Sequence, residues 1–110
     1  MENNTRLYGM LGFAMRAGKV VIGAEQVISR LKDNSKSAVR LVLLSVGASE
    51  QTKKRLTYKC EFYKKEIREI NIQTEELGRL LGKLYAPAVI AITDEGFAQE
   101  IVKAISPASL

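Results

Sequence analysis

The run VRLVLLSV at residues 39–46 constrains the fold most, because only Arg40 and Ser45 interrupt its apolar side chains. A strand that is apolar on both faces has to be covered on both faces, whereas a half-covered strand alternates apolar and polar residues. The run AVIAIT at residues 88–93 has the same character. The chain is therefore expected to contain a sheet with other elements packed against both of its sides.

Extended and helical patterns alternate along the rest of the chain. The segment IREINI at residues 67–72 alternates apolar and polar residues, and residues 20–22 form a short β-branched run. Helical spacing of apolar residues separates these segments. Helices are expected over residues 6–17, 24–32, 50–63 and 74–82, and in a last helix that ends near residue 105. This alternation predicts an α/β fold, a three-layer α/β/α sandwich.

Several of these helices follow a residue whose side chain can accept hydrogen bonds from the first free N–H groups of a helix. The expected caps are Thr5, Ser49, Thr74 and either Thr93 or Asp94. Ser106 and Pro107 are expected to end the last helix, because the residue before a proline is biased away from helical geometry.

Length and charge narrow the class of protein. The 110 residues are expected to form one domain, residues 1–110, and 46% of them are hydrophobic, as is ordinary for a globular protein. A net charge of +5 suits a polyanionic partner but also serves solubility. Apolar runs stay well short of the roughly 20 residues of a membrane span, and the N-terminal segment lacks a signal-peptide pattern. We expect a cytoplasmic protein with no membrane partner.

Catalytic and metal chemistry finds little support in the residue types. The chain has no histidine, which excludes His-based acid–base catalysis and His-containing metal sites. The single cysteine, Cys60, lies on an expected apolar helix stripe and is interpreted as structural, in keeping with a reducing cytosol. The acid pairs Glu75-Glu76 and Asp94-Glu95 fall at expected helix starts, where negative charge is favourable. No catalytic residue, metal or cofactor is predicted.

Gly23 marks the candidate functional corner, because it separates the extended run 20–22 from the following helix. A helix N-terminus behind a glycine bend offers free backbone N–H groups to an anionic ligand. We interpret this corner as an RNA-reading site. Arg16 and Lys19 flank it in sequence, and each is either a solvated cation or an RNA contact.

Aromatic residues offer candidate stacking surfaces for bases. Tyr63 is expected in the core, Tyr58 is open to either role, and Tyr85 is expected at the surface because it lies in a loop beside Pro87. The lysines of the helix expected at residues 50–63 are interpreted as a solvated face rather than a binding site: Lys53, Lys54 and Lys59.

Five segments, in their order along the chain, resemble the ribosomal protein L-seven-Ae family. They are GAEQVISRLK, VRLVLLSV, KCEFYKK, LGRLLGK and AVIAIT. The segment LGFAMRAGKVVIG resembles the bacterial YlxQ-like branch of this family. The resemblance covers residues 5–105, and its most specific local mark is the LG-x-x-x-G motif of Leu77, Gly78 and Gly82.

The resemblance implies a sandwich around a mixed four-stranded sheet that binds kink-turn RNA, a sharply bent duplex with tandem sheared G·A pairs beside a bulge. The family's Gly-x-Asn-Glu-x-x-Lys motif falls at the second helix, where Gly23 matches the glycine and Ala24 the variable position. Glu25, Gln26 and Ser29 stand where Asn, Glu and Lys are expected. Because carboxylate and amide oxygens accept hydrogen bonds from a guanine edge, Glu25 and Gln26 are expected to share that contact.

The resemblance also implies two further RNA-binding surfaces. The loop after the LG-x-x-x-G motif would cover the extruded nucleotide, and it consists of Lys83, Leu84, Tyr85, Ala86 and Pro87. The start of the third helix would contribute Ser49 and Lys53. The cations expected to neutralise phosphates are Lys19, Arg30, Lys53 and Lys83.

Two functions follow from these observations. The first is a non-enzymatic, monomeric RNA-binding protein that recognises and stabilises kink-turn RNA, with ribosomal RNA as a candidate partner. The second is a protein–protein adaptor on the same scaffold, because three positions depart from the RNA-reading motif. An enzyme is disfavoured, since the sequence shows no nucleophile–base pair and no metal cluster.

Overall fold

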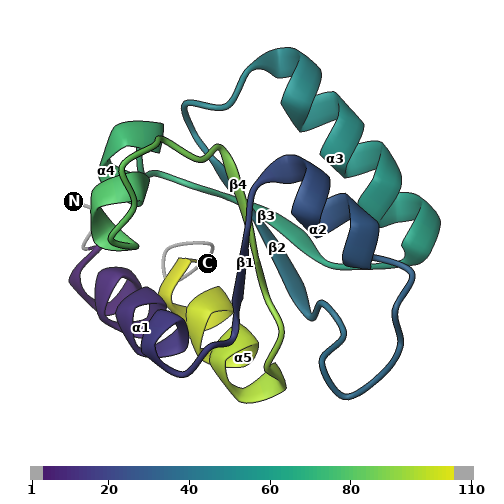
Figure 1. Cartoon of the computed structure of the whole chain (residues 1–110), viewed down its shortest axis with the longest axis horizontal. Coiled ribbons are helices and arrows are strands. Elements are labelled where there is room, and N and C mark those ends of the chain that lie inside the picture. The colour runs from purple at the N-terminus through teal and green to yellow at the C-terminus, as the bar shows by residue number, and fades with distance from the viewer. Residues whose placement is uncertain (1–3, 106–110) are drawn as a thin grey trace.

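The computed structural model describes residues 4–105, in which five helices and four strands alternate (Figure 1). The expected end of the last helix at Ser106 and Pro107 lies outside the described residues. The elements are α1 (Thr5–Arg16), β1 (Val20–Ile22), α2 (Ala24–Arg30), β2 (Leu41–Ser45), α3 (Glu50–Tyr63), β3 (Ile67–Ile70), α4 (Thr74–Leu80), β4 (Val89–Ile92) and α5 (Glu95–Ile105).

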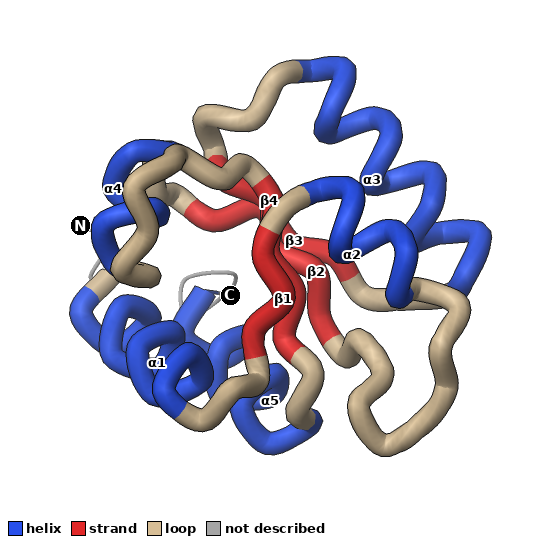
Figure 2. The backbone as a smooth tube through the Cα atoms, viewed as in Figure 1, coloured by secondary structure: helices blue, strands red, loops and turns tan. Residues whose placement is uncertain are grey.

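The four strands form one mixed sheet in the order β1-β4-β2-β3 (Figure 2). Strands β2 and β3 run parallel, and β4 pairs antiparallel with both β1 and β2. All residues of β2 and β4 are buried, as their nearly continuous apolar runs predict. The mixed four-stranded sheet implied by the family resemblance is therefore confirmed.

Helices cover both faces of this sheet. Leu41 and Leu43 of β2 pack with α1, α4 and α5, whereas Val42 and Leu44 of the same strand pack with α2 and α3. Figure 1 shows α1, α4 and α5 on one side of the strands and α2 and α3 on the other. Successive side chains of a strand point to opposite faces, so one apolar run supplies both cores. The predicted α/β/α sandwich is confirmed.

Two helix starts differ from the sequence-based expectation. Thr5 and Thr74 are the first residues of α1 and α4 and do not cap them, since the N-cap positions are Asn4 and Gln73. The Thr74 hydroxyl donates to the Glu75 carboxylate at 3.1 Å, so it is engaged within its own first turn. Neither N-cap side chain accepts a hydrogen bond from its helix.

Two other caps are confirmed. The Ser49 hydroxyl accepts a hydrogen bond from the Thr52 amide at 3.1 Å at the start of α3. One Asp94 carboxylate oxygen accepts from the Phe97 amide at 2.9 Å at the start of α5. Both satisfy N–H groups that have no acceptor inside the helix.

Gly78 allows the loop between α4 and β4 to lie directly on α4. A Cβ added at this buried glycine would collide with the backbone carbonyl oxygen of Tyr85 and would lie 3.4 Å from Cδ of Pro87. The Lys83 amide also donates to the Gly78 carbonyl at 2.8 Å. The loop over residues 83–87 is therefore fixed against α4 by a contact that a larger residue cannot make.

We expect Gly78→Ala to lower the free energy of unfolding by about 1–3 kcal/mol, as overpacking of a tight contact does. A backbone oxygen cannot rotate away as a side chain can, so the loop itself would have to move. The matched control is Gly9→Ala in α1, where an added Cβ has nothing within 4 Å. That change should stabilise the helix by up to ~1 kcal/mol. Urea denaturation of both variants checks this, and equal shifts would contradict it.

Candidate functional site

The candidate corner lies at one end of the sheet, where main-chain hydrogen bonds join distant segments. The Gly23 amide donates to the Val89 carbonyl at 2.8 Å, which places the start of α2 beside the start of β4. The Ser45 amide donates to the Ala88 carbonyl at 2.9 Å, which places the end of β2 at the same edge. We call this edge, with residues 23–26, 45–49 and 83–88, the loop end of the sheet. Figure 1 shows these segments near the label of β4.

Gly23 connects β1 to α2 in a backbone conformation that side chains rarely adopt. Its φ is +103° and its ψ is 142°, a region open to glycine and strained for other residues. The Gly23 amide completes the pairing with β4, and its carbonyl accepts from the Val27 amide at 2.9 Å, the first bond of α2. The bend predicted from the sequence is thus present, and α2 starts directly from the sheet edge.

Glu25 lies in the first turn of α2 and forms a two-pronged ion pair with Arg55 of α3. Arg55 donates to the two carboxylate oxygens at 2.6 and 3.2 Å. The hydrogen bond and the positive charge of Arg55 hold the pKa of Glu25 below its usual value. Arg55 is not among the residues that the sequence analysis selected, because the pairing depends on how α2 packs beside α3.

The other polar residues of the motif differ in their availability. Gln26 is exposed, and its side-chain amide has no hydrogen-bond partner among residues 4–105. The Ser29 hydroxyl donates to the Gln26 carbonyl at 2.8 Å, so it is turned back onto its own helix. Ala24 is half-buried and packs against the core below α2. Gln26 therefore offers the freer side chain for an outside ligand.

The loop at residues 83–87 presents two apolar side chains to solvent. Leu84 is fully exposed and Tyr85 is 57% exposed, which confirms the surface position expected for Tyr85. Lys83 is half-buried and Ala86 is exposed. Pro87, which is expected with these residues to cover a ligand, is buried and packs inward as part of the loop's anchor on α4.

Ser49 lies at the loop end and Lys53 follows it in the first turn of α3, but their polar groups are engaged inside the protein. The Ser49 hydroxyl caps α3. The Lys53 side chain is 20% exposed, and its Nζ forms ion pairs with Glu69 at 3.3 Å and Glu50 at 3.9 Å. The same Nζ donates to the Val46 carbonyl at 3.4 Å. Both residues therefore hold the turn between β2 and α3 in this structure.

Two expected cations are not brought to the loop end. The Lys19 carbonyl accepts from the Thr93 amide at 2.9 Å, which places Lys19 at the opposite end of β1 from Gly23. Arg30 is the last residue of α2, one helix length away from Gly23. Nearness in sequence to the glycine bend therefore did not give nearness in space for Lys19 and Arg30.

The remaining chemistry-bearing residues have structural positions. Cys60 is completely buried in the core beneath α3, and burial raises the pKa of its thiol to about 11, which confirms its structural interpretation. Glu75 and Glu76 lie in the first turn of α4, as predicted. Tyr63 packs against the core, whereas Tyr58 is exposed on α3. Within residues 4–105, no three His, Cys, Asp or Glu side chains are grouped to hold a metal ion.

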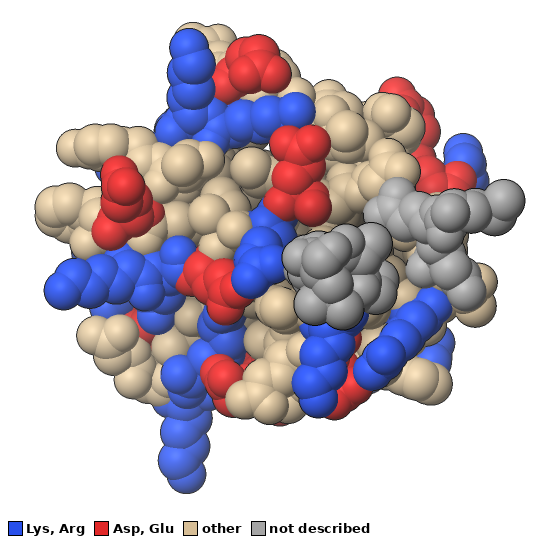
Figure 3. Space-filling view, turned by 180° about the vertical axis from the view of Figure 1, so that it is seen from behind, with Lys and Arg blue, Asp and Glu red and all other residues tan. Residues whose placement is uncertain are grey.

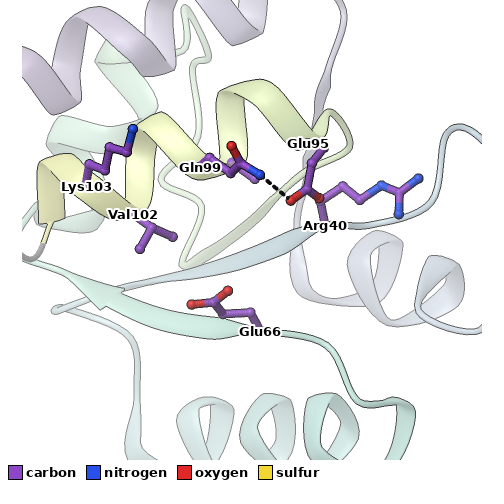
Figure 4. A pocket seen from close by; sticks show the side chains of 7 residues that line it. Arg40, Glu66, Glu95, Gln99, Val102 and Lys103 are labelled. Carbon is purple, nitrogen blue, oxygen red and sulfur yellow. Dashed lines mark hydrogen bonds between the residues drawn. The ribbon is translucent and has the colours of Figure 1, made fainter.

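A pocket of about 270 Å³ lies at the other end of the sheet, between α5 and the starts of β2 and β3 (Figure 4). Its lining residues are Arg40, Glu66, Glu95, Ala98, Gln99, Val102 and Lys103. Gln99 donates to Glu95 at 3.0 Å. The pocket's cations and anions balance one another, and it shares no residue with the loop end. Figure 3 likewise shows acidic and basic side chains interspersed over the face opposite to that in Figure 1.

Comparison with known proteins gives consistent results. The sequence profile of the ribosomal protein L7Ae/L30e/S12e/Gadd45 family matches residues 5–102. Over 95 residues, 86% of this chain and 90% of the relative, the sequence is 39% identical to the RNA-binding protein YlxQ of Bacillus subtilis (strain 168).

Two solved structures are also similar. A Bacillus halodurans C protein of unknown function superposes with a TM-score of 0.81 and 33% identity, covering 94% of this chain and 99% of that one. The Giardia lamblia 15.5kD RNA binding protein superposes with a TM-score of 0.73 over 94% of this chain and 85% of that one. Its identity of 14% limits that likeness to the fold.

Proposed function

This chain belongs to the ribosomal protein L7Ae/L30e/S12e/Gadd45 family, in the YlxQ-like branch, and we propose that it is a non-enzymatic RNA-binding protein of the cytosol that recognises and stabilises kink-turn RNA. The observation that carries the proposal is the hydrogen bond from the Gly23 amide to the Val89 carbonyl, which places the start of α2 beside the strand that directly follows the 83–87 loop. The RNA-binding name of the Bacillus subtilis relative supports the partner class. The family's ribosomal members make ribosomal RNA a candidate target.

Each exposed group at the loop end fits one part of such an RNA. The Glu25 carboxylate and the Gln26 amide would accept hydrogen bonds from guanine edges of the sheared pairs. Leu84 and Tyr85 would cover an unstacked base, because single unpaired bases stack readily on apolar and aromatic side chains. Lys83 would approach a phosphate from the same loop. A rigid sheet edge that holds both groups of side chains would select RNA that is already bent.

We propose fewer direct contacts than the sequence alone suggested. Lys19 and Arg30 lie away from the loop end, so they are left out of the contact with the sheared pairs. Ser49, Lys53 and Pro87 are assigned to holding the turn and loop in place. The direct contacts would come from Glu25, Gln26, Lys83, Leu84 and Tyr85.

Replacing both acceptors of α2, with Glu25→Ala and Gln26→Ala together, should weaken kink-turn binding by about tenfold or more, the range of a lost base-edge contact. Binding to an unkinked duplex of equal length should barely change. The control is Glu95→Ala with Gln99→Ala, an exposed bonded pair on α5 away from the loop end. Gel-shift titration measures both, and equal losses on the two RNAs would contradict the proposal.

Leu84→Ala with Tyr85→Ala should weaken kink-turn binding by about 1–3 kcal/mol, as loss of a stacked base does. Stability should change little, since both side chains are exposed. Calorimetric titration checks this against an RNA whose bulged nucleotide is abasic, on which the two changes should have no effect. Phe13→Ala, another exposed aromatic residue on α1, serves as the control. An unchanged loss with the abasic RNA would contradict the assigned contact.

A protein–protein adaptor is the competing function, and the exposed apolar pair Leu84 and Tyr85 favours it as well. Salt dependence separates the two functions. Phosphate contacts release counterions, so one contact, such as that proposed for Lys83, should lower RNA affinity by about threefold between about 50 and 200 mM salt. Binding that rises or stays unchanged over this range, or a kink-turn affinity no higher than that for a plain duplex, would favour the adaptor.

A further inference from the structure

We infer that Arg55 is a positioning residue of the proposed RNA site, which holds the Glu25 carboxylate in one orientation at the loop end. The inference rests on the proposed function and deepens it. It names a residue of α3 that would decide how sharply the protein distinguishes sheared G·A pairs from ordinary base pairs.

Arg55 and Glu25 form a bidentate ion pair, in which the guanidinium binds both carboxylate oxygens. Nη1 of Arg55 lies 2.6 Å from one oxygen of Glu25, and Nη2 lies 3.2 Å from the other. Two parallel bonds from a planar guanidinium fix both the place and the rotation of a carboxylate, which a single ammonium bond cannot do. Glu25 is therefore oriented by α3 before any ligand arrives.

The paired carboxylate keeps capacity for an RNA ligand. An ionised carboxylate has about four acceptor positions, and Arg55 occupies one on each oxygen. The Glu25 side chain remains 74% exposed in the pair. The remaining acceptor positions are thus open to a guanine N–H group, and they are fixed in direction. A side chain that is already ordered loses less rotamer freedom on binding.

Stability alone gives a weak reason for this pair. The Glu25 side chain is 74% exposed and the Arg55 side chain 46%, and ion pairs open to solvent contribute little to folding because water screens them. The pair instead connects the first turn of α2 to α3, whose own start is held at the loop end by the Ser49 cap and the Lys53 contacts. Arg55 thereby fixes Glu25 relative to the sheet edge that carries the 83–87 loop.

The test uses the full chain with two RNAs, a kink-turn and the same RNA with its G·A pairs replaced by Watson–Crick pairs. The measured quantity is the dissociation constant of the Watson–Crick RNA divided by that of the kink-turn, so a larger ratio means sharper discrimination. Arg55→Lys keeps the positive charge but cannot form the two guanidinium hydrogen bonds to Glu25. We therefore expect this ratio to fall by about tenfold, which is the discrimination that one base contact provides. The salt dependence of binding and the melting temperature should stay close to those of the unaltered protein.

Two further variants make the outcome specific. In a Glu25→Ala background, Arg55→Lys should reduce the ratio no further, because it acts only through Glu25. The matched control is Arg6→Lys, at the Arg6–Glu100 ion pair of 2.8 Å that joins α1 to α5 on the other face of the sheet. That change should leave the ratio as it is.

Three results would overturn the inference while leaving the proposed function in place. The first is an unchanged ratio in Arg55→Lys. The second is a ratio that falls further when Arg55→Lys is added to Glu25→Ala. The third is an equal loss of affinity for both RNAs in Arg55→Ala, together with a shallower salt dependence of binding. The last result would make Arg55 a phosphate contact. If the unaltered protein bound both RNAs equally, the proposed function itself would fail, and the inference with it.

Discussion

The antiparallel pairing of β1 with β4 is the constraint on which the candidate site depends. It ends at the hydrogen bond from the Gly23 amide to the Val89 carbonyl. Through this pairing α2 starts at the same sheet edge at which the 83–87 loop ends. The loop in turn is fixed because Gly78 has no side chain to keep it off α4. Two segments that are far apart in the sequence are therefore held in one fixed relation by main-chain contacts, which are stiffer than contacts between exposed side chains.

The charges at the loop end are largely paired with one another. Glu25 is bound by Arg55, and Lys53 is held between Glu69, Glu50 and the Val46 carbonyl. The net charge of +5 is therefore not concentrated as a row of unpaired cations at this edge. An RNA that binds here would gain affinity from directed acceptors and from the exposed loop side chains. Such a site favours recognition of a particular bent shape over general attraction to polyanions, which is a different balance from that of a basic groove.

Much of the fold could be predicted from local patterns, and the failures have identifiable causes. The nearly continuous apolar runs at residues 39–46 and 88–93 correctly indicated strands buried on both faces. Thr5 and Thr74 were wrong as caps because each is already helical, and a threonine before a helical pattern does not reveal whether the helix starts at it or after it. At the site, the glycine bend and the exposed Tyr85 were predictable. Lys19 and Arg30 were expected beside Gly23 only because they are near it in sequence.

The sequence by itself determined the layers of this protein, because the spacing of apolar residues determines which faces of each element must be buried. It also determined the bend at Gly23, because a residue without a side chain can adopt a positive φ. Only the tertiary structure decided which side chains meet at the loop end. Sheet register brought Ala88 beside Ser45, and the packing of α2 beside α3 gave Glu25 its partner Arg55. Both depend on how separate elements dock, and local spacing along the chain carries no information on that.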